Sequence, residues 1–257
     1  MLSIRTGALG VCTGLLVLPL AACGDNAGLE RLSRGETGKV VEVRSGDVLA
    51  LDNGLVVRLA GLQAPRMDEP GAAAARADLE KRALGRRVAL YYGGARRDAF
   101  GRALAQVRIE DSRQWAQGAL LTDGVVRERT FADNRALAAP MLDAEARARR
   151  AKRGLWALAD DQVRLPQEVT ARVDGFQIVE GRVRSVFPGR DGYEVEMDGA
   201  RDGFVVELSR PAAADLAAAG QPPQSLVGKL VRVRGAIGRD GLMRVDHPEA
   251  VEVLKEG

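Results

Sequence analysis

The feature that most restricts the fold is a series of short apolar runs separated by turn residues. Residues 37–65 hold three such runs, rich in Val and Leu, and the sequences Ser-Gly-Asp and Asp-Asn-Gly separate them. Apolar residues at alternate positions indicate strands with one buried face, and Asp-Asn-Gly favours a tight hairpin. Residues 37–65 are therefore predicted to form three consecutive strands.

The elements after these strands point to a barrel. An Ala-rich helix is expected in residues 70–83, strands in residues 86–92 and 102–110, and a closing helix in residues 134–153. Three strands, a helix, two strands and further helices suit a five-stranded barrel of the OB type. The predicted fold class is therefore mainly β with helices (α+β).

A second unit in residues 169–257 follows the same order, with three strands, an Ala-rich helix and two strands. We expect a second OB-like barrel there. Such barrels often bind single-stranded nucleic acid through aromatic platforms and basic grooves. Residues 165–257, however, hold 12 basic and 15 acidic side chains, a net charge of −3, which argues against strong nucleic-acid binding. Packing against the first unit, or against another envelope protein, fits this charge as well.

Three residues of kinds that often mark functional sites are interpreted as structural. Trp115 begins a helix and is predicted to lie in the core, and Trp156 is predicted to plug the base of the first barrel. His247 is the only histidine and precedes the last strand. Because no second His or Cys lies near it in the sequence, a metal site is not expected there.

The N-terminal residues suggest export and anchoring. Arg5 precedes an apolar run from Ala8 to Ala22 that is too short to span a bilayer, and a small pair of residues stands directly before Cys23. This arrangement resembles the lipobox of bacterial lipoproteins, which implies cleavage before Cys23 and lipidation of its thiol. An ordinary signal peptide with an incidental cysteine is the alternative. Cys12 would leave with the signal, so no disulfide framework is possible.

A lipidated Cys23 implies a location in the cell envelope. The chain would be anchored on the non-cytoplasmic side, at the periplasmic face of the inner or outer membrane, with membrane lipid as its first partner. Asp25 lies two residues beyond the cysteine and leaves the choice between the two membranes open.

The first barrel also carries a family resemblance. The motifs SGDVLAL, VRLAGLQAP, PGAAAARADLE, RDAFGRALAQV and EARARRAKRGLW stand in order between Lys39 and Trp156. Together they resemble the staphylococcal-nuclease-like (thermonuclease) family. The resemblance implies a domain that cleaves phosphodiester bonds in DNA and RNA, usually with calcium held by carboxylates and with arginines on the phosphate.

The predicted organisation follows from these two resemblances. We expect a signal peptide in 1–22, a lipidated tether in 23–36, a nuclease-like domain in 37–158, a linker in 159–168 and an OB-like domain in 169–257.

The family's functional positions are only partly retained. The resemblance places the first-turn metal ligand at Asp47, and the two catalytic, phosphate-binding arginines at Arg58 and Arg102. Gln63 stands where the second calcium carboxylate is expected, and Arg66 stands where the catalytic glutamate is expected. Bound calcium is therefore doubtful, and no other cofactor is implied.

The charge at these positions changes sign relative to the family pattern. Two aspartates, one glutamate and two arginines sum to −1, whereas the residues present here sum to +2: Asp47, Arg58, Gln63, Arg66 and Arg102. Loss of a general base alone costs about 10²–10⁴ in rate. The sequence thus favours a weak or inactive nuclease that retains binding of single-stranded nucleic acid or another phosphate-bearing ligand, with Arg58, Arg66 and Arg102 as the anion-binding residues.

Two alternatives stay open. An active metal-dependent phosphodiester hydrolase could use Asp47 with Arg58 and Arg102, if a shift of the loop brought Asp68 or Glu69 into the site. A purely structural interpretation assigns the two arginines to ion pairs and Asp47 to its turn.

Overall fold

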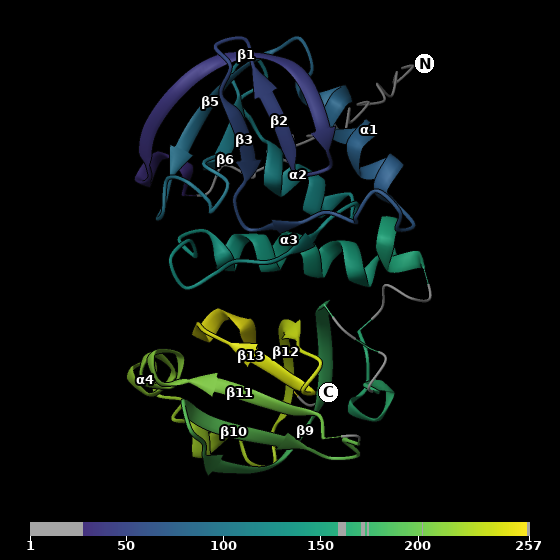
Figure 1. Cartoon of the computed structure of the whole chain (residues 1–257), viewed down its shortest axis with the longest axis vertical. Coiled ribbons are helices and arrows are strands. Elements are labelled where there is room, and N and C mark those ends of the chain that lie inside the picture. The colour runs from purple at the N-terminus through teal and green to yellow at the C-terminus, as the bar shows by residue number, and fades with distance from the viewer. Residues whose placement is uncertain (1–27, 159–162, 171–172, 174, 202, 256–257) are drawn as a thin grey trace, which may run out of the picture.

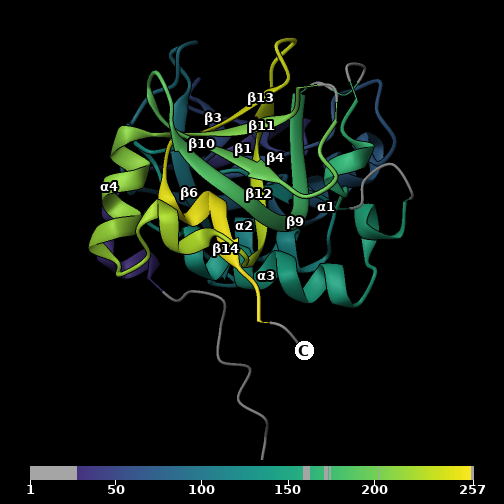
Figure 2. The same ribbon diagram turned by 90° about the horizontal axis from the view of Figure 1, so that it is seen from below.

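The computed structural model describes residues 28–158, 163–170, 173, 175–201 and 203–255. Two barrels lie one above the other along the long axis, and helix α3 (Ala138–Arg150) lies between them (Figure 1). Viewed along that axis, the second barrel lies over the first (Figure 2). The expected signal peptide and Cys23 fall outside the described residues.

Each barrel is closed by five strands within the described residues. The first is built from β1 (Ser33–Ser45), β2 (Val48–Leu51), β3 (Val56–Leu59), β5 (Arg87–Tyr92) and β6 (Ala103–Ile109). Strands β1, β2 and β3 form an antiparallel meander, β3 pairs with β6 in parallel, and β5 joins β6 to β1. The predicted hairpin between β2 and β3 is present, with Gly54 at φ 82°.

Strand β1 closes the barrel because it is long enough to serve two neighbours. Its first half pairs with β5 and its second half with β2, with register shifts along its length. Such irregularities bend a strand and increase its twist. The strand begins at Ser33, within the stretch expected to be a tether, because the hydroxyl of Tyr92 and the guanidinium of Arg97 donate hydrogen bonds to the carboxylate of Glu36.

Helices and short elements complete the first domain. They are η1 (Leu29–Arg31), β4 (Leu62–Gln63), α1 (Ala72–Ala83), β7 (Gln114–Trp115), α2 (Ala116–Thr122), β8 (Arg127–Glu128), α3 and η2 (Gly154–Ala157). Gly124, two residues beyond the end of α2, has φ 71°, and a Cβ there would lie 2.4 Å from the carbonyl oxygen of Arg153. This close approach fixes the end of α3 against the end of α2.

The second barrel repeats the strand order of the first. Its elements are η4 (Pro166–Glu168), β9 (Gly175–Pro188), β10 (Gly192–Met197), β11 (Val205–Ser209), α4 (Arg210–Ala218), η5 (Pro223–Leu226), β12 (Leu230–Ile237), β13 (Leu242–Val245), η6 (Pro248–Ala250) and β14 (Val251–Val253). A parallel pair, β11 with β13, closes it as β3 with β6 closes the first. The predicted fold class is confirmed.

Three apolar clusters hold the described residues together. One fills each barrel, and the third joins the two domains. Trp115 lies in the core of the first barrel, as predicted. Trp156 does not: it packs with Ala148 of α3 and Ile178 of β9, between the barrels. Trp156, which was expected at the base of the first barrel, is thus part of the contact between the two domains.

A buried ion cluster also crosses the interface. Nη1 of Arg234 lies 2.9 Å from Oε2 of Glu128 and 2.9 Å from Oε2 of Glu145, while Nη2 lies 2.7 Å from Oε1 of Glu252. Arg234, Glu128 and Glu145 are at most 3% exposed. Removing one partner from such a cluster leaves an uncompensated buried charge, so the cluster fixes the docking of the two domains.

In the part of the chain that the structure describes, no helix combines the length and the apolar character that crossing a bilayer requires.

Candidate functional site

The retained aspartate lies in the turn between β1 and β2 with both carboxylate oxygens engaged. The hydroxyl of Ser45 donates to Oδ1 of Asp47 at 2.8 Å, and Nη2 of Arg58 lies 3.3 Å from Oδ2. Asp47 is only 6% exposed. Arg58, in β3, also donates to the carbonyl oxygen of Leu62 at 3.2 Å. Asp47 and Arg58 therefore form a partly buried pair that couples the β1–β2 turn to β4.

The glutamine at the second carboxylate position has an arginine partner that the sequence did not reveal. Strand β4 pairs with β8, so the segment after β8 passes beside Gln63. Nη1 of Arg129 donates to Oε1 of Gln63 at 2.7 Å. Burial first and the nearby Arg58 guanidinium second lower the pKa of Arg129. The side-chain oxygen of Gln63 is thus turned toward a cation.

Arg66 lies away from this pair and makes its own local contacts. Its Nε lies 3.2 Å from Oε1 of Glu69 and 3.8 Å from Oδ1 of Asp68. The backbone N–H of Arg66 donates to Oε2 of Glu69 at 2.7 Å. Asp68 and Glu69, the two carboxylates of the loop-shift alternative, are therefore engaged by Arg66, and the Arg66 side chain is 71% exposed.

Arg102 directly precedes β6, the strand that pairs in parallel with β3, which carries Arg58. In that ladder Arg58 pairs with Leu104, two residues beyond Arg102. Nε of Arg102 donates to Oδ2 of Asp98 at 2.7 Å, and its guanidinium lies over the ring of Phe100. Burial raises the pKa of Asp98, but hydrogen bonds from the side chain and backbone of Arg102 outweigh it and hold that pKa below its ordinary value.

These contacts do not suit calcium. Calcium takes six to eight oxygen ligands, chiefly carboxylates and carbonyls. Here one oxygen of Asp47 accepts from Ser45 and the other forms an ion pair with Arg58, while the oxygen of Gln63 accepts from Arg129. Across the part of the chain that the structure describes, no three His, Cys, Asp or Glu side chains are placed to hold a metal ion together. The residues at these positions do not fit the cation that the family resemblance implies.

The carboxylate partners of the three arginines also change the net charge of the site from the +2 obtained from the family positions alone. Arg58 is paired with Asp47, Arg102 with Asp98, and Arg66 with Asp68 and Glu69. Among the described residues, Arg129 has no carboxylate within the 4.0 Å that defines an ion pair. The positive charge that lacks a counterion at this site therefore lies on Arg129, a residue outside the sequence motifs.

Arg129 also connects the site to the second domain. Its guanidinium lies 5.1 Å from the ring centre of Phe131 and 5.2 Å from that of Phe176 in β9. The segment with Thr130 and Phe131 faces His247, whose Nε2 lies 3.0 Å from Oγ1 of Thr130. His247 is 4% exposed and contacts the first domain at this hydrogen-bond distance from Thr130.

Comparison with known proteins supports the assignment of the first barrel. Residues 56–158 match the family described as staphylococcal nuclease homologue. The match leaves β1, β2 and the whole second barrel outside it. No curated protein matches the chain. The first barrel is therefore a staphylococcal-nuclease-like domain of OB type, and the second is a further barrel of the same strand order.

Proposed function

We propose that this chain is an envelope protein, anchored through Cys23, whose nuclease-like domain binds a phosphate-bearing ligand without metal-dependent hydrolysis. One observation carries the proposal: guanidinium groups engage the side-chain oxygens at both metal-ligand positions, Arg58 at Asp47 and Arg129 at Gln63. A metal-assisted mechanism needs those oxygens on the cation. Guanidinium groups, in contrast, are the preferred partners of phosphate.

The arginines suit an exchangeable ligand. The ion pairs of Arg66 are exposed and contribute little stability, about 0–1 kcal/mol each. A phosphate group can therefore compete with Asp68 and Glu69 for Arg66. Arg58 lies in β3, and Arg102 directly precedes β6, the parallel neighbour of β3. Two guanidinium groups on adjacent segments suit a ligand with successive phosphates, such as single-stranded nucleic acid.

Anchoring rests on the sequence motif before Cys23. The described part of the chain begins at Gly28, so only a short segment separates the lipidated residue from the first barrel. Binding would therefore take place close to the membrane surface.

The test is an assay of hydrolysis and binding with protein that starts at residue 24 and so retains every described residue. Single-stranded DNA and RNA are incubated with calcium or with chelator, and binding is measured in parallel. An Asp47→Ala variant tests the hydrolase alternative. Arg58→Gln and Arg102→Gln variants test ligand binding, and Arg76→Gln, on the outer face of α1, is their control.

We expect no calcium-dependent cleavage and binding that survives chelator but weakens in the Arg58 and Arg102 variants. Removal of a phosphate-contacting arginine should reduce the salt dependence of binding by a slope of about 0.7 for single strands. Calcium-dependent cleavage that Asp47→Ala abolishes would instead establish the active hydrolase. Absence of both cleavage and binding would refute the proposal.

A further inference from the structure

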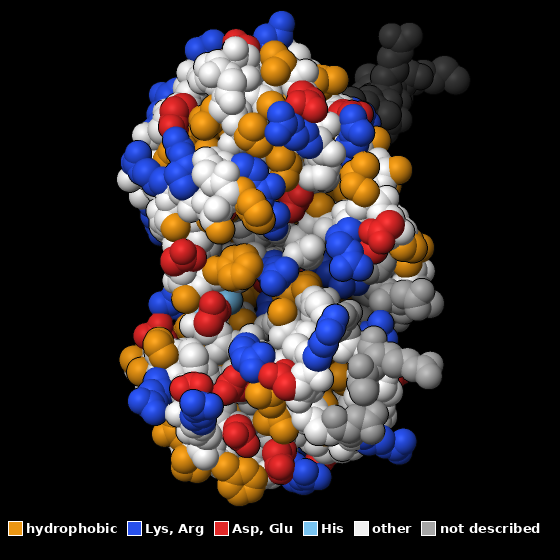
Figure 3. Space-filling model, viewed as in Figure 1, with side chains coloured by type: hydrophobic (Ala, Val, Ile, Leu, Met, Phe, Trp, Pro, Cys, Tyr) orange, Lys and Arg blue, Asp and Glu red, His pale blue; other side chains and the backbone are white. Residues whose placement is uncertain are grey.

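The interface between the domains contains a pocket next to Arg129. The space-filling view shows a waist between the two lobes, where basic, apolar and histidine side chains lie together (Figure 3). The pocket has a volume of about 140 Å³, and both domains line it: Phe131 comes from the first, and Phe176 and His247 come from the second. The second barrel thus forms part of the wall of a cavity that the first barrel alone does not have.

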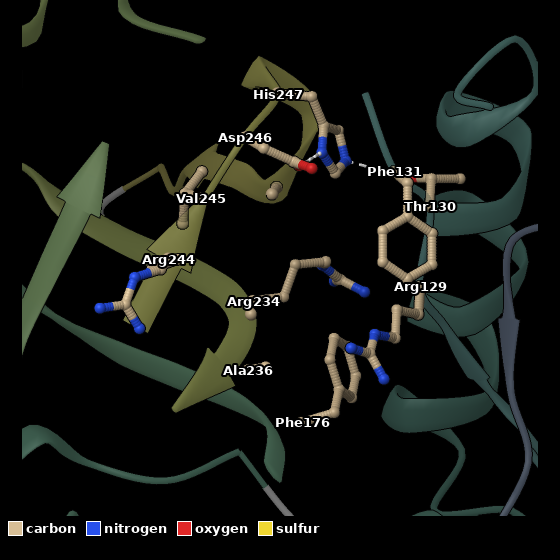
Figure 4. Close-up of a pocket in the computed structure, with 12 residues that line it drawn as sticks. Arg129, Thr130, Phe131, Phe176, Arg234, Ala236, Arg244, Val245, Asp246 and His247 are labelled. Carbon is tan, nitrogen blue, oxygen red and sulfur yellow. Dashed lines mark hydrogen bonds and ion pairs between the residues drawn. The ribbon is translucent and has the colours of Figure 1, made fainter. Parts of the chain in front are cut away.

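Arg129 is oriented toward this pocket by aromatic contacts. Its side chain lies between the rings of Phe131 and Phe176 (Figure 4). Cation–π contacts of this kind hold the plane of the guanidinium and leave its N–H groups at the edge. Nη1 donates to Gln63, and no carboxylate of the described residues lies within ion-pair distance, although the more distant Asp246 favours the charged form. A negatively charged ligand that accepts hydrogen bonds would pair with the charge of Arg129 and bind its remaining N–H donors.

Other polar groups of the pocket are already satisfied. Arg234 is held by Glu128, Glu145 and Glu252. His247 contacts Thr130 through Nε2 and Asp246 through Nδ1, at 3.0 and 2.6 Å. Arg129 therefore supplies the anion-binding group, and the remaining specificity comes from the apolar walls.

The size of the pocket limits the apolar part of a ligand. An engineered cavity of about 150 Å³ binds benzene, so about 140 Å³ accommodates one ring. Phe131 is 42% exposed, which leaves part of its surface free for contact with that ring. Offset or edge-to-face packing against Phe131 and Phe176 favours an aromatic ring.

We propose that the pocket between the barrels binds a small phosphate ester with a single aromatic ring. The phosphate accepts hydrogen bonds from Arg129, and the ring packs against Phe131 and Phe176. The second domain is thereby part of the binding site. The inference rests on the proposed function in one respect, that the site favours phosphate, but it assigns the ligand to Arg129 and the interface and not to Arg58 and Arg102.

The test uses protein starting at residue 24 and isothermal titration calorimetry with three probes. Phenyl phosphate carries both recognised groups, inorganic phosphate lacks the ring, and a single-stranded oligonucleotide reports on the proposed function. The variants are Arg129→Gln, Phe176→Leu and Phe131→Leu. Matched controls are Arg184→Gln and Phe187→Leu, which alter exposed side chains of the second barrel away from the pocket. Thermal unfolding verifies that each variant is folded.

We expect phenyl phosphate to bind about tenfold more tightly than inorganic phosphate, because ring contacts add to the phosphate contact. Each Phe variant should remove most of that difference, and Arg129→Gln should weaken both small probes about tenfold or more. The control variants should bind as the unmodified protein does.

Two results would overturn the inference. One is phenyl phosphate that binds no better than inorganic phosphate. The other is phenyl phosphate binding that the Arg129 and Phe176 variants leave unchanged. If the oligonucleotide still binds through Arg58 and Arg102 in either case, the pocket assignment alone fails. If the oligonucleotide does not bind but phenyl phosphate does, the nucleic-acid form of the proposed function fails and the pocket stands.

Discussion

Arg129 donates a hydrogen bond of 2.7 Å to Oε1 of Gln63, the side chain that occupies the position of a metal carboxylate in the family pattern. This contact links the substitution at residue 63 to a cation on a different segment of the chain. The two residues meet because β4 and β8 pair. A carboxylate introduced at residue 63 would thus pair with the guanidinium of Arg129, which would compete with a metal ion for it.

Calcium binding is therefore predicted to require three changes and not two. Gln63→Asp with Arg66→Glu should show no increase in melting temperature with calcium, because Arg129 pairs with the new carboxylate. Adding Arg129→Gln should restore a calcium-dependent increase, since a ligand at 100 times its Kd stabilises by about 2.7 kcal/mol. Differential scanning fluorimetry with calcium and with chelator measures this. A calcium-induced shift in the unmodified protein would contradict our account of the site.

Asp98 is predicted to restrain Arg102. In Asp98→Asn the side-chain oxygen that accepts from the backbone N–H groups of Phe100 and Arg102 is kept, whereas the charge is lost. A bound phosphate then no longer competes with the Asp98 carboxylate for Arg102, so the oligonucleotide should bind about tenfold more tightly at each salt concentration.

Filter binding over a range of salt concentrations tests this effect. Asp111→Asn is the matched control, because Asp111 is an exposed carboxylate paired with Arg86. Equal affinities of both variants for the oligonucleotide would show that Arg102 does not contact the nucleic acid.

Arg234 is predicted to dominate the stability of the domain interface. Arg234→Met should destabilise the protein by about 3–5 kcal/mol, because Glu128 is left buried without a counterion and Glu145 keeps only Arg149, at 3.3 Å. Arg184→Met removes an exposed pair with Glu196 and should cost at most about 1 kcal/mol. Urea denaturation at neutral pH measures both. Similar losses for the two variants would mean that the buried cluster has no special role.

Glu36 provides a pH-dependent test of the start of β1. The hydrogen bond from Tyr92 lowers the pKa of Glu36 below its ordinary value of 4.5. The contribution of Glu36 to stability is therefore fully present above about pH 4.5 and is lost as the pH falls through the lowered pKa. Glu36→Gln should cost about 0.5 kcal/mol at neutral pH, as expected of a half-exposed pair. The difference from the unmodified protein should vanish well below pH 4.5. A difference that persists in acid would assign the effect to packing.

Most of the fold follows from local patterns in the sequence. The hairpin at Asp52 to Gly54, the Ala-rich α1 and the strands β5 and β6 lie where alternation and turn residues predict them. These signals are local, because a strand with one buried face alternates by itself. The docking of the barrels has no such signal. Trp156 was consequently assigned to the base of one barrel, whereas it packs against Ile178 of the other.

Only those residues of the site that lie in the family motifs were predictable from the sequence. Asp47, Arg58 and Arg102 stand in recognisable segments: Asp47 lies in the β1–β2 turn, Arg58 in β3, and Arg102 directly before β6. Their carboxylate partners and Arg129 were not predicted. The chain holds 38 basic residues, so nothing in the local sequence distinguishes an arginine that lacks a counterion. That property depends on distances between segments, which only the folded chain defines.

The buried ion cluster makes the two domains depend on each other, although the family match treats the first as a separate segment of the sequence. Cutting after residue 158, where the family match ends, would separate Glu128 and Glu145 from Arg234 and strip the cover from Trp156. The fragment would present two acids and an indole to water on the same face. An isolated nuclease-like domain would therefore differ in stability from the same domain in the full chain, because its buried charges are compensated by a residue of the second barrel.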